Sequence, residues 1–487
     1  MRLGSGVINS ASARAVLLLA LGLPLAGCLL TDDKLDPALD IPAAYNAGPK
    51  SEKVAEAALP KLDWWRGFRS RELSEIVEQA RESNLDIAAA VARIVQADAQ
   101  SRIAGAALLP IVDADGGVTK SQNSRNTGSG GSGGGGSPRT IYSASLTASY
   151  EIDFWGKNRA ALQSAEQSAV AARYDREVVG LSTVAATANA YFQVLSSQDR
   201  LQVARDNLKS ATRVLNLIKQ RLDAGTASEL DTSQQESVVN SLRANIPPLE
   251  QTLQQNKTAL AVLMGIPPER VKIRGGSLRA IAIPRVTPGL PSELITQRPD
   301  IRFAEAQLAA ADADVANARA QLLPSITLTG TGGYQSAALK MLFEPQSTFY
   351  SIAAGVTQPI FEGGRLRGNV DLQKGRQDEL MQDYRKSVVS GFADVENALT
   401  AIRQTAETER LQANVVTSSR RAFQISEQRL NEGTVDLVTV LSTQQTLYQA
   451  QDALAQARLA RVLAVVQLYQ ALGGGWLPKP VEQADAR

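Results

Sequence analysis

The chain has 487 residues and nearly balanced charge, with 51 Lys and Arg against 49 Asp and Glu, and it contains no histidine. Balanced charge gives no electrostatic signature of nucleic-acid binding. The single cysteine excludes an internal disulfide, and without histidine neither a Cys/His zinc site nor a Cys-His nucleophile pair can form. Aromatic residues make up only 5% of the chain, and Ala, Gln, Leu, Ser and Val dominate long stretches, which favours extended helices.

The first 27 residues have the layout of an export signal. Arg2 and Arg14 precede the apolar run from Ala15 to Ala26. This run is too short to span a bilayer as a stable helix. The run leads into LAGC, which ends at Cys28 and resembles a bacterial lipoprotein signal. The resemblance implies that Cys28 becomes the lipidated first residue of the mature protein. In lipoproteins of this type an aspartate after the cysteine tends to retain the protein in the inner membrane. Here Leu29 follows Cys28, so the resemblance implies that the protein is located in the outer membrane. The alternative is a buried free cysteine.

The rest of the chain is a tandem duplication. NLDIAAAVARIVQADAQSRIAGAALLP, residues 84–110, matches RPDIRFAEAQLAAADADVANARAQLLP, residues 298–324, at a shift of 214 positions. QRLDAGT at 220–226 matches QRLNEGT at 428–434 at a shift of 208. The difference reflects the Gly-rich segment 127–138, which we interpret as an exposed hairpin tip that is longer in the first copy.

Four segments have the period of a half-buried strand. From Tyr142, YSASLTASYEID alternates apolar and polar residues without error. Soluble hairpins and membrane strands both explain this alternation. Four strands cannot close a membrane barrel, which needs at least about eight, so several chains would have to pool them. The four predicted strands are 111–122, 142–153, 325–336 and 350–361.

Long helices are predicted beside these strands. Residues 158–224 contain no proline and one glycine, which predicts a nearly continuous helix of about 67 residues, roughly 100 Å long. A second helix should return to Leu263, and Pro247 and Pro248 should kink or interrupt it. A heptad seam on the first helix predicts coiled-coil packing; it consists of Leu201, Ala204, Leu208, Ala211, Leu215, Ile218 and Leu222.

Order and spacing of these features resemble the TolC family of trimeric outer-membrane efflux channels, in particular its lipoprotein branch, called NodT-like or OprM-like. The resemblance covers nearly the whole mature chain. It rests on LAGC, on the paired DI and LLP segments and on the paired QRLxxGT turns. It also rests on DWWRGFRSREL from Asp63, and on DFWGKNRA from Asp153 against IFEGGRLRG from Ile360.

The resemblance implies a fold class of long antiparallel helices, packed as a coiled-coil barrel and continuous with a twelve-stranded outer-membrane β-barrel. Each of three chains would give four strands, and a small mixed equatorial domain would surround the helical tunnel. The implied boundaries are 1–27 for the signal peptide, 28–72 for the N-terminal equatorial segment, 73–265 for repeat 1, 266–290 for the equatorial linker, 291–473 for repeat 2 and 474–487 for the equatorial tail.

The family also implies where the tunnel closes. Its gate would lie at the Gly225 and Gly433 turns, where acidic residues face inward. The family aspartate falls on Asp231, but its second-copy counterpart is Thr439, and Asp436 is the nearest acidic substitute. Without the family, Asp231 is a solvated charge near a helix start, where it favours the helix dipole. The turn residues expected to meet an adaptor are Gly225, Thr226, Gly433 and Thr434.

We therefore expect a conduit for drugs or small solutes and not an enzyme, with no metal and no cofactor besides covalent lipid on Cys28. Its expected partners are two further copies of the chain, a periplasmic adaptor and an inner-membrane pump of the resistance-nodulation-division type. One alternative is the outer-membrane duct of a type I protein-secretion system. Another is a periplasm-spanning structural coiled-coil lipoprotein, which explains Cys28 and the helices but not the alternating strands.

Overall fold

The computed structural model describes residues 39, 41–42, 45–46, 61–122, 138–286, 291–474 and 476. The expected lipidation site, Cys28, and the Gly-rich segment up to residue 137 lie outside the described residues. The chain divides into two compact units, each of which combines segments from both sequence repeats. Among the described residues, the first unit comprises 95–122, 138–171 and 305–383, and the second unit comprises all the others.

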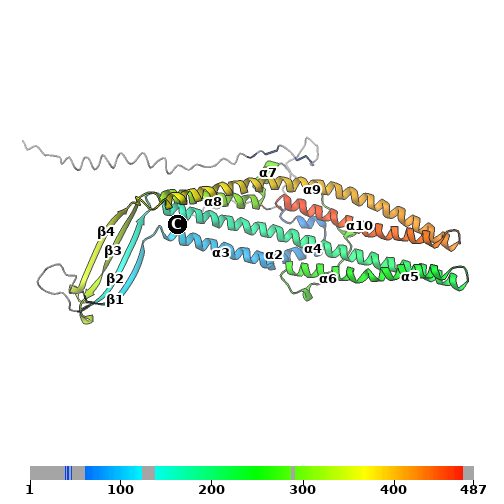
Figure 1. The fold of residues 1–487 in the computed structure, drawn as a ribbon, viewed down its shortest axis with the longest axis horizontal. Coiled ribbons are helices and arrows are strands. Elements are labelled where there is room, and N and C mark those ends of the chain that lie inside the picture. The colour runs from blue at the N-terminus through cyan, green and yellow to red at the C-terminus, as the bar shows by residue number, and fades with distance from the viewer. Residues whose placement is uncertain are drawn as a thin grey trace, which may run out of the picture. The chain divides into compact units, whose positions relative to one another are not determined.

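The first unit contains a four-stranded antiparallel sheet whose strands lie in chain order (Figure 1). Its strands are β1 (Ile111–Ser121), β2 (Arg139–Ile152), β3 (Ser325–Ser336) and β4 (Thr348–Thr357). All four strands occur where the sequence predicts them, and β3 has the predicted bounds. The prediction for the last strand was wrong at its end: β4 stops at Thr357, and residues 358–361 are not in a strand. Pro359 explains the early end, because proline has no amide hydrogen for a strand ladder.

The helices repeat the duplication seen in the sequence. The two longest, α4 and α9, each have 67 residues, and α3 and α8 each have 22. The α-helices are α2 (Arg71–Ser83), α3 (Leu85–Ala106), α4 (Lys157–Asp223), α5 (Glu229–Ala244), α6 (Ile246–Leu263), α7 (Pro291–Gln297), α8 (Pro299–Ala320), α9 (Arg365–Asn431) and α10 (Leu437–Ala471). Short 3-10 helices are η1 (Trp64–Phe68), η2 (Pro268–Arg270), η3 (Leu278–Ala280), η4 (Leu339–Met341) and η5 (Pro345–Ser347).

The predicted seam of α4 packs against other helices of the second unit. Every seam side chain is buried or half-buried. Ile218 lies in one apolar cluster with Phe423 of α9 and Leu437 of α10, and Leu215 lies in another with Val239 of α5. Among the described helices, α4 alone has a stretch long and apolar enough to cross a membrane, and 56% of that stretch is buried. Packing against neighbouring helices therefore accounts for its apolar composition.

The return helix of repeat 1 is interrupted beside its two prolines, as predicted. Helix α5 ends at Ala244, α6 begins at Ile246, and the amide of Asn245 between them bonds back to the carbonyls of Ser241 and Arg243. Pro247 and Pro248 lie in the first turn of α6, where a missing N–H leaves no helical bond unmade. Repeat 2 has no such break, because α10 continues from Leu437 to Ala471.

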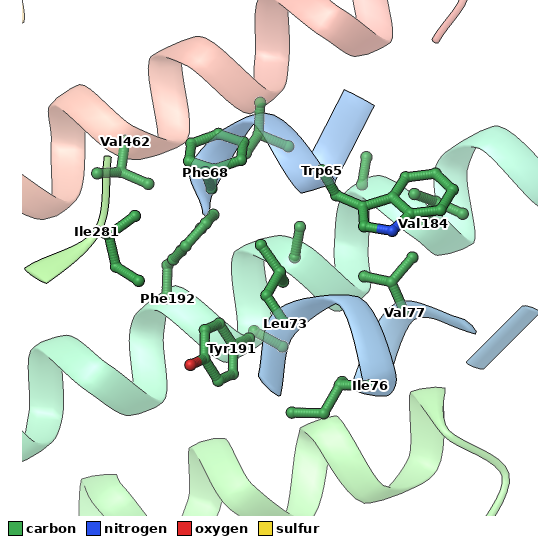
Figure 2. Close-up of a cluster of buried hydrophobic side chains, with 14 of the residues drawn as sticks. Trp65, Phe68, Leu73, Ile76, Val77, Val184, Tyr191, Phe192, Ile281 and Val462 are labelled. Carbon is green, nitrogen blue, oxygen red and sulfur yellow. The ribbon is translucent and has the colours of Figure 1, made fainter. Parts of the chain in front are cut away.

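The Trp-Trp segment contributes three aromatic side chains to the main apolar cluster of the second unit (Figure 2). Trp65 and Phe68 from η1 are 2% and 0% exposed. The Phe68 ring packs on Phe192 of α4 with centroids 5.0 Å apart, and Trp64 stacks on Tyr469 of α10 at 4.8 Å. Each such burial contributes about 1.5–3 kcal/mol. The segment thereby joins η1 to both α4 and α10.

The expected equatorial belt is described only in part. Its described residues are 39, 41–42, 45–46, 61–72, 266–286, 474 and 476; they contain the short helices η1, η2 and η3 and the start of α2, and none of them lies in a strand. The remaining belt residues lie outside the part of the chain that the structure describes.

Candidate functional site

The sheet of the first unit has one mainly polar face, which also carries Ile141 and Phe349, and one mainly apolar face. Residues directly opposite in an antiparallel pair share a face. Asp113 lies opposite Thr147 and Thr147 lies opposite Thr331, and the hydroxyl oxygens of the two threonines are 3.4 Å apart. Strand register places further polar residues on this face: Asp115, Ser143, Ser145, Ser149, Glu151, Thr327, Thr329, Gln335 and Ser351.

The opposite face consists mainly of apolar side chains, and the chain itself leaves several large ones exposed. Leu146 is 59% exposed, Tyr350 83% and Ile352 84%. Large contiguous apolar surfaces of this kind mark contact with lipid or with another protein. The register gives this face its other members: Val112, Val118, Tyr142, Ala144, Ala148, Tyr150, Ile326, Leu328, Tyr334 and Val356. Of the described strands, β1 and β4 pair on one side only, so both edges of the sheet are open.

The two predicted docking turns in the second unit share one hydrogen-bonding pattern. Gly225 has φ +72°, and its amide donates to the Leu222 carbonyl at 2.9 Å. The amide and the hydroxyl of Thr226 both donate to the Arg221 carbonyl, at 2.8 and 3.1 Å. This is a Schellman cap, which needs a left-handed residue at the glycine position. Gly433 and Thr434 repeat it at the end of α9, with φ +75° at the glycine and both threonine donors bonded to the Arg429 carbonyl.

The three gate candidates cap the helices that follow these turns. Asp231 accepts from the Ser228 amide at 2.9 Å and from the Ser228 hydroxyl at 2.8 Å, while the Asp231 amide donates back to the Ser228 hydroxyl. In repeat 2 the two residue types exchange places, so that the carboxylate comes first and the hydroxyl three residues later. Asp436 accepts from the Thr439 amide at 2.9 Å and from the Thr439 hydroxyl at 2.6 Å. Each pair thus keeps one carboxylate and one hydroxyl at the start of its helix, in reversed order.

The cap favours the ionised form of Asp436. The Thr439 hydroxyl and amide hold the pKa of the Asp436 carboxyl below its ordinary value, because both donate to the ionised form. Asp436 is exposed and Asp231 half-buried. The structure brings Asp436 and Thr439 together and pairs Asp231 with Ser228, which the sequence analysis did not single out.

Side chains of α4 connect the two helix pairs near the turns. The Arg221 guanidinium donates to the Leu430 carbonyl of α9 at 2.5 Å. Eight residues earlier, Arg213 makes two hydrogen bonds to Glu427 of α9, at 3.0 and 3.1 Å. The buried Leu430 and Val440 side chains lie in the apolar cluster beside these bonds. Polar and apolar contacts thus hold α4 against α9 and α10 close to the turns.

One equivalent pair of exposed apolar residues at the turns was not predicted from the sequence. Leu230 is 66% exposed in the first turn of α5, and Val438 is 60% exposed in the first turn of α10. The two positions are related by the same shift of 208 that relates the turns, which is the signal that could have identified them. Across the described ranges, no group of three or more acidic or cysteine side chains is placed to hold a metal ion.

Comparison with known proteins identifies the architecture. The model of the outer membrane efflux protein family matches residues 76–266 and 290–474. The chain is 40% identical over 466 residues to the pyoverdine export outer membrane protein OpmQ of Pseudomonas putida, covering 95% of this chain and 98% of that protein. It is 32% identical over 466 residues to the toluene efflux pump outer membrane protein TtgF of Pseudomonas putida, covering 94% and 96% respectively.

A solved structure supports the same assignment. The outer-membrane channel OprN superposes with a TM-score of 0.85 at 26% identity, and the match covers 92% of this chain and 100% of that one. These findings confirm the fold class predicted from the sequence, in which paired long helices continue into membrane strands, four from each chain. The chain belongs to the outer membrane efflux protein family.

Proposed function

We propose that three copies of this chain form the outer-membrane channel of a tripartite efflux system, which passes small solutes from a periplasmic adaptor and an inner-membrane pump to the exterior. The observation that carries the proposal is the sheet with a mainly apolar face, whose polar members Lys120, Thr140, Ser336 and Thr348 lie at one end, and with two open edges. In lipid those edges must be paired, and four strands are too few to close a barrel. Three sheets joined edge to edge satisfy both requirements.

The names of the relatives favour small solutes over secreted proteins. One relative is named for pyoverdine and another for toluene. A channel in this family is not an enzyme, and its selectivity depends on pore diameter and on the charge of the lining. A purely structural coiled-coil lipoprotein would have no use for the apolar face of the sheet. We therefore favour efflux of small solutes over both alternatives, with a pump of the resistance-nodulation-division type.

The turns of the second unit are the proposed periplasmic end. Gly225, Thr226, Gly433 and Thr434 are exposed, and the exposed Leu230 and Val438 lie beside them, so an adaptor would meet both backbone turns and apolar side chains. Asp231 and Asp436 would supply the charge of the gate. We further propose that Cys28 carries lipid in the outer membrane, which mass spectrometry of the N-terminal peptide would test.

Neighbouring residues on opposite faces of β2 provide the experiment. In a background without Cys28, Leu146→Cys should resist a water-soluble maleimide, and a fluorophore attached there in detergent should be quenched by brominated lipid after reconstitution. Thr147→Cys should react with the maleimide from the barrel lumen and escape the quencher. Equal reactivity and equal quenching at the two positions would contradict a membrane-spanning barrel.

A further inference from the structure

The two edge strands of the sheet are complementary to each other. Among the described strands, β1 and β4 each pair on one side only, so one row of backbone groups on each strand has no ladder partner (Figure 1). Val118 of β1 is 66% exposed, and Tyr350 and Val356 of β4 are 83% and 71% exposed. An open edge of this kind pairs readily with a strand of another chain. A second copy of this chain offers such a strand, because β4 of one copy can pair with β1 of the next.

The two faces of the sheet restrict the register of this pair. Ala114 of β1 lies opposite Leu146 of β2. Leu146 lies opposite Gly332 of β3, which lies opposite Tyr350 of β4, so these four positions share the mainly apolar face. Residues two apart on a strand share a face, whereas a shift of one residue exchanges the faces. The register between β4 and β1 of the next copy can therefore change only in steps of two residues.

The lengths of the two edge strands favour one of these registers. If Ala354 lies opposite Ala114 of the partner subunit, all ten residues of β4 lie opposite residues of β1. A shift by two residues in one direction moves the end of β4 past the start of β1. A shift in the other direction leaves the first two residues of β1 without a strand opposite them. Unpaired backbone groups are costly in the hydrocarbon region of a membrane, so the register with the full overlap is the most stable.

The tilt of strands in a closed barrel favours the same register. Across one sheet Ala114 lies level with Tyr350, and this register sets Tyr350 opposite Val118 of the partner subunit. The ladder thus advances one residue per strand. With a rise of about 3.4 Å per residue and a strand spacing of about 4.8 Å, the tilt is about 35°. Membrane barrels have tilts of about 35–45°, whereas the two shifted registers would give about 20° and about 47°.

We propose that β4 of each copy pairs with β1 of the next, with Ala354 opposite Ala114 of the partner subunit. The register rests on the function proposed above, because it requires three copies around one channel. On the lipid-facing side it sets the ring of Tyr350 beside Val118 of the partner subunit. Cross-strand pairs of an aromatic and a β-branched side chain stabilise antiparallel sheets.

The mainly polar face accommodates the same register. It sets Gly355 and Ala353 of β4 opposite Asp113 and Asp115 of the partner subunit. Like charges directly opposite each other would destabilise the pair, and here neither carboxylate meets a second charge or a bulky side chain. Both faces of the sheet are therefore compatible with the register that backbone pairing and barrel tilt favour.

Disulfide trapping in membranes tests the register, in a background without Cys28. Ala354→Cys is combined in turn with Val112→Cys, Ala114→Cys and Gly116→Cys, three positions on one face of β1. Directly opposite Cβ atoms lie about 4.5–5.5 Å apart and those displaced by two residues about 7–8 Å apart, whereas a disulfide joins Cβ atoms about 3.5–4.5 Å apart. The pair with Ala114→Cys should therefore oxidise at least about tenfold faster than the other two, and give crosslinked dimers and trimers on a non-reducing gel.

Such a crosslink joins different copies, because two strands separate β1 from β4 within one sheet, a distance of about 14 Å. Ala354→Cys alone is the control and should stay uncrosslinked. Faster oxidation with Val112→Cys or Gly116→Cys would overturn the register and leave the trimeric barrel in place. A trimer in light scattering without a crosslink in any variant would overturn the pairing of β4 with β1. A monomer in light scattering would overturn the channel itself, and the register with it.

Discussion

Asn84 and Arg298 occupy equivalent positions in the two repeats and make the same contact. The Asn84 side-chain nitrogen donates to the Leu263 carbonyl at 2.8 Å, and the Arg298 guanidinium donates to the Ala471 carbonyl at 3.1 Å. Each bond joins the start of a repeat to the end of its return helix. The acceptors are related by the same 208 positions as the turns, although the donor side chains differ completely. The two repeats therefore share this closing contact but not the residue that makes it.

Arg298 should be the more costly of the two to replace. It also bonds Asp300 at 3.0 and 2.7 Å and Asp394 at 3.0 Å. Burial alone would lower the pKa of Arg298, but the hydrogen bonds and charges of Asp300 and Asp394 raise it. Arg298→Met leaves two carboxylates without their cation and should reduce the free energy of unfolding by about 1–3 kcal/mol. This loss is smaller than that for breaking a fully buried ion pair, because both carboxylates are partly exposed.

Chemical denaturation followed by circular dichroism measures this loss. The control is Arg93→Met, which removes a single exposed contact to Asp175 at 3.5 Å and should change stability by less than about 1 kcal/mol. Equal midpoints for the two variants would show that the Arg298 contacts do not support the fold.

Gly265 and Gly473 should tolerate alanine less well than the turn glycines. All four glycines have positive φ, but a Cβ on Gly265 would meet the Ser83 carbonyl and one on Gly473 would meet the Gln297 carbonyl. A Cβ on Gly225 or Gly433 meets nothing within 4 Å. Alanine at the turns should cost about 1 kcal/mol for backbone strain alone. Thermal denaturation should show a clearly larger loss of stability for alanine at Gly265 or Gly473. A loss of stability no larger than that of Gly225→Ala would contradict the close approach of the carbonyl groups.

A substitution at Asp231 should separate the effect of its charge on ion selectivity from its role in capping α5. Asp231→Asn keeps a carbonyl acceptor for the Ser228 amide and removes the charge. If Asp231 from three chains faces a narrow axis, the variant should lose cation selectivity, seen as a smaller reversal potential in a potassium chloride gradient. Asp175→Asn serves as the charge-matched control away from the turns. Unchanged selectivity in Asp231→Asn would place this carboxylate away from the pore.

The bond from Arg221 to the Leu430 carbonyl should help to keep the channel closed. Arg221→Met removes the donor while retaining an apolar stem, and planar-bilayer recordings should show a higher open probability. Lys219→Met is the control, because it breaks an ion pair to Glu236 within the first helix pair and leaves the link to α9 intact. A variant at Arg221 that opens no more often than this control would exclude the bond as a restraint on gating.

The cap of α10 should weaken in acid. Because the folded pKa of Asp436 is lowered, its ionised form stabilises the cap fully above the ordinary aspartate pKa of about 3.9, and that contribution is lost as pH falls through the folded pKa. Below about pH 4, hydrogen exchange in the first turn of α10 should accelerate beyond the intrinsic pH effect. Asp436→Asn cannot titrate and should remove this extra dependence. The same acceleration in the variant would assign it to another group.

Local patterns in the sequence predicted most of the fold, because strand and helix periods, glycine caps and prolines act over a few residues. The seam from Leu201 to Leu222 and the break before Pro247 are of this kind. The exchanged caps were not predicted, because Ser228 and Asp436 look unrelated until the backbone shows that both begin a helix. The burial of Gln444, which is 1% exposed, was not predicted for another reason. A glutamine in a Gln-rich helix looks solvent-facing, and its burial depends on which helices pack beside it.

The most direct test of the account is the mass and conductance of the purified full-length protein. Light scattering with subtraction of the detergent, followed by planar-bilayer recording, should give a stable trimer that inserts and passes ions, even if openings are rare. Such a result would establish that three sheets form one barrel. A monomer or dimer without conductance would mean that the strands do not enter the membrane, and it would contradict the channel.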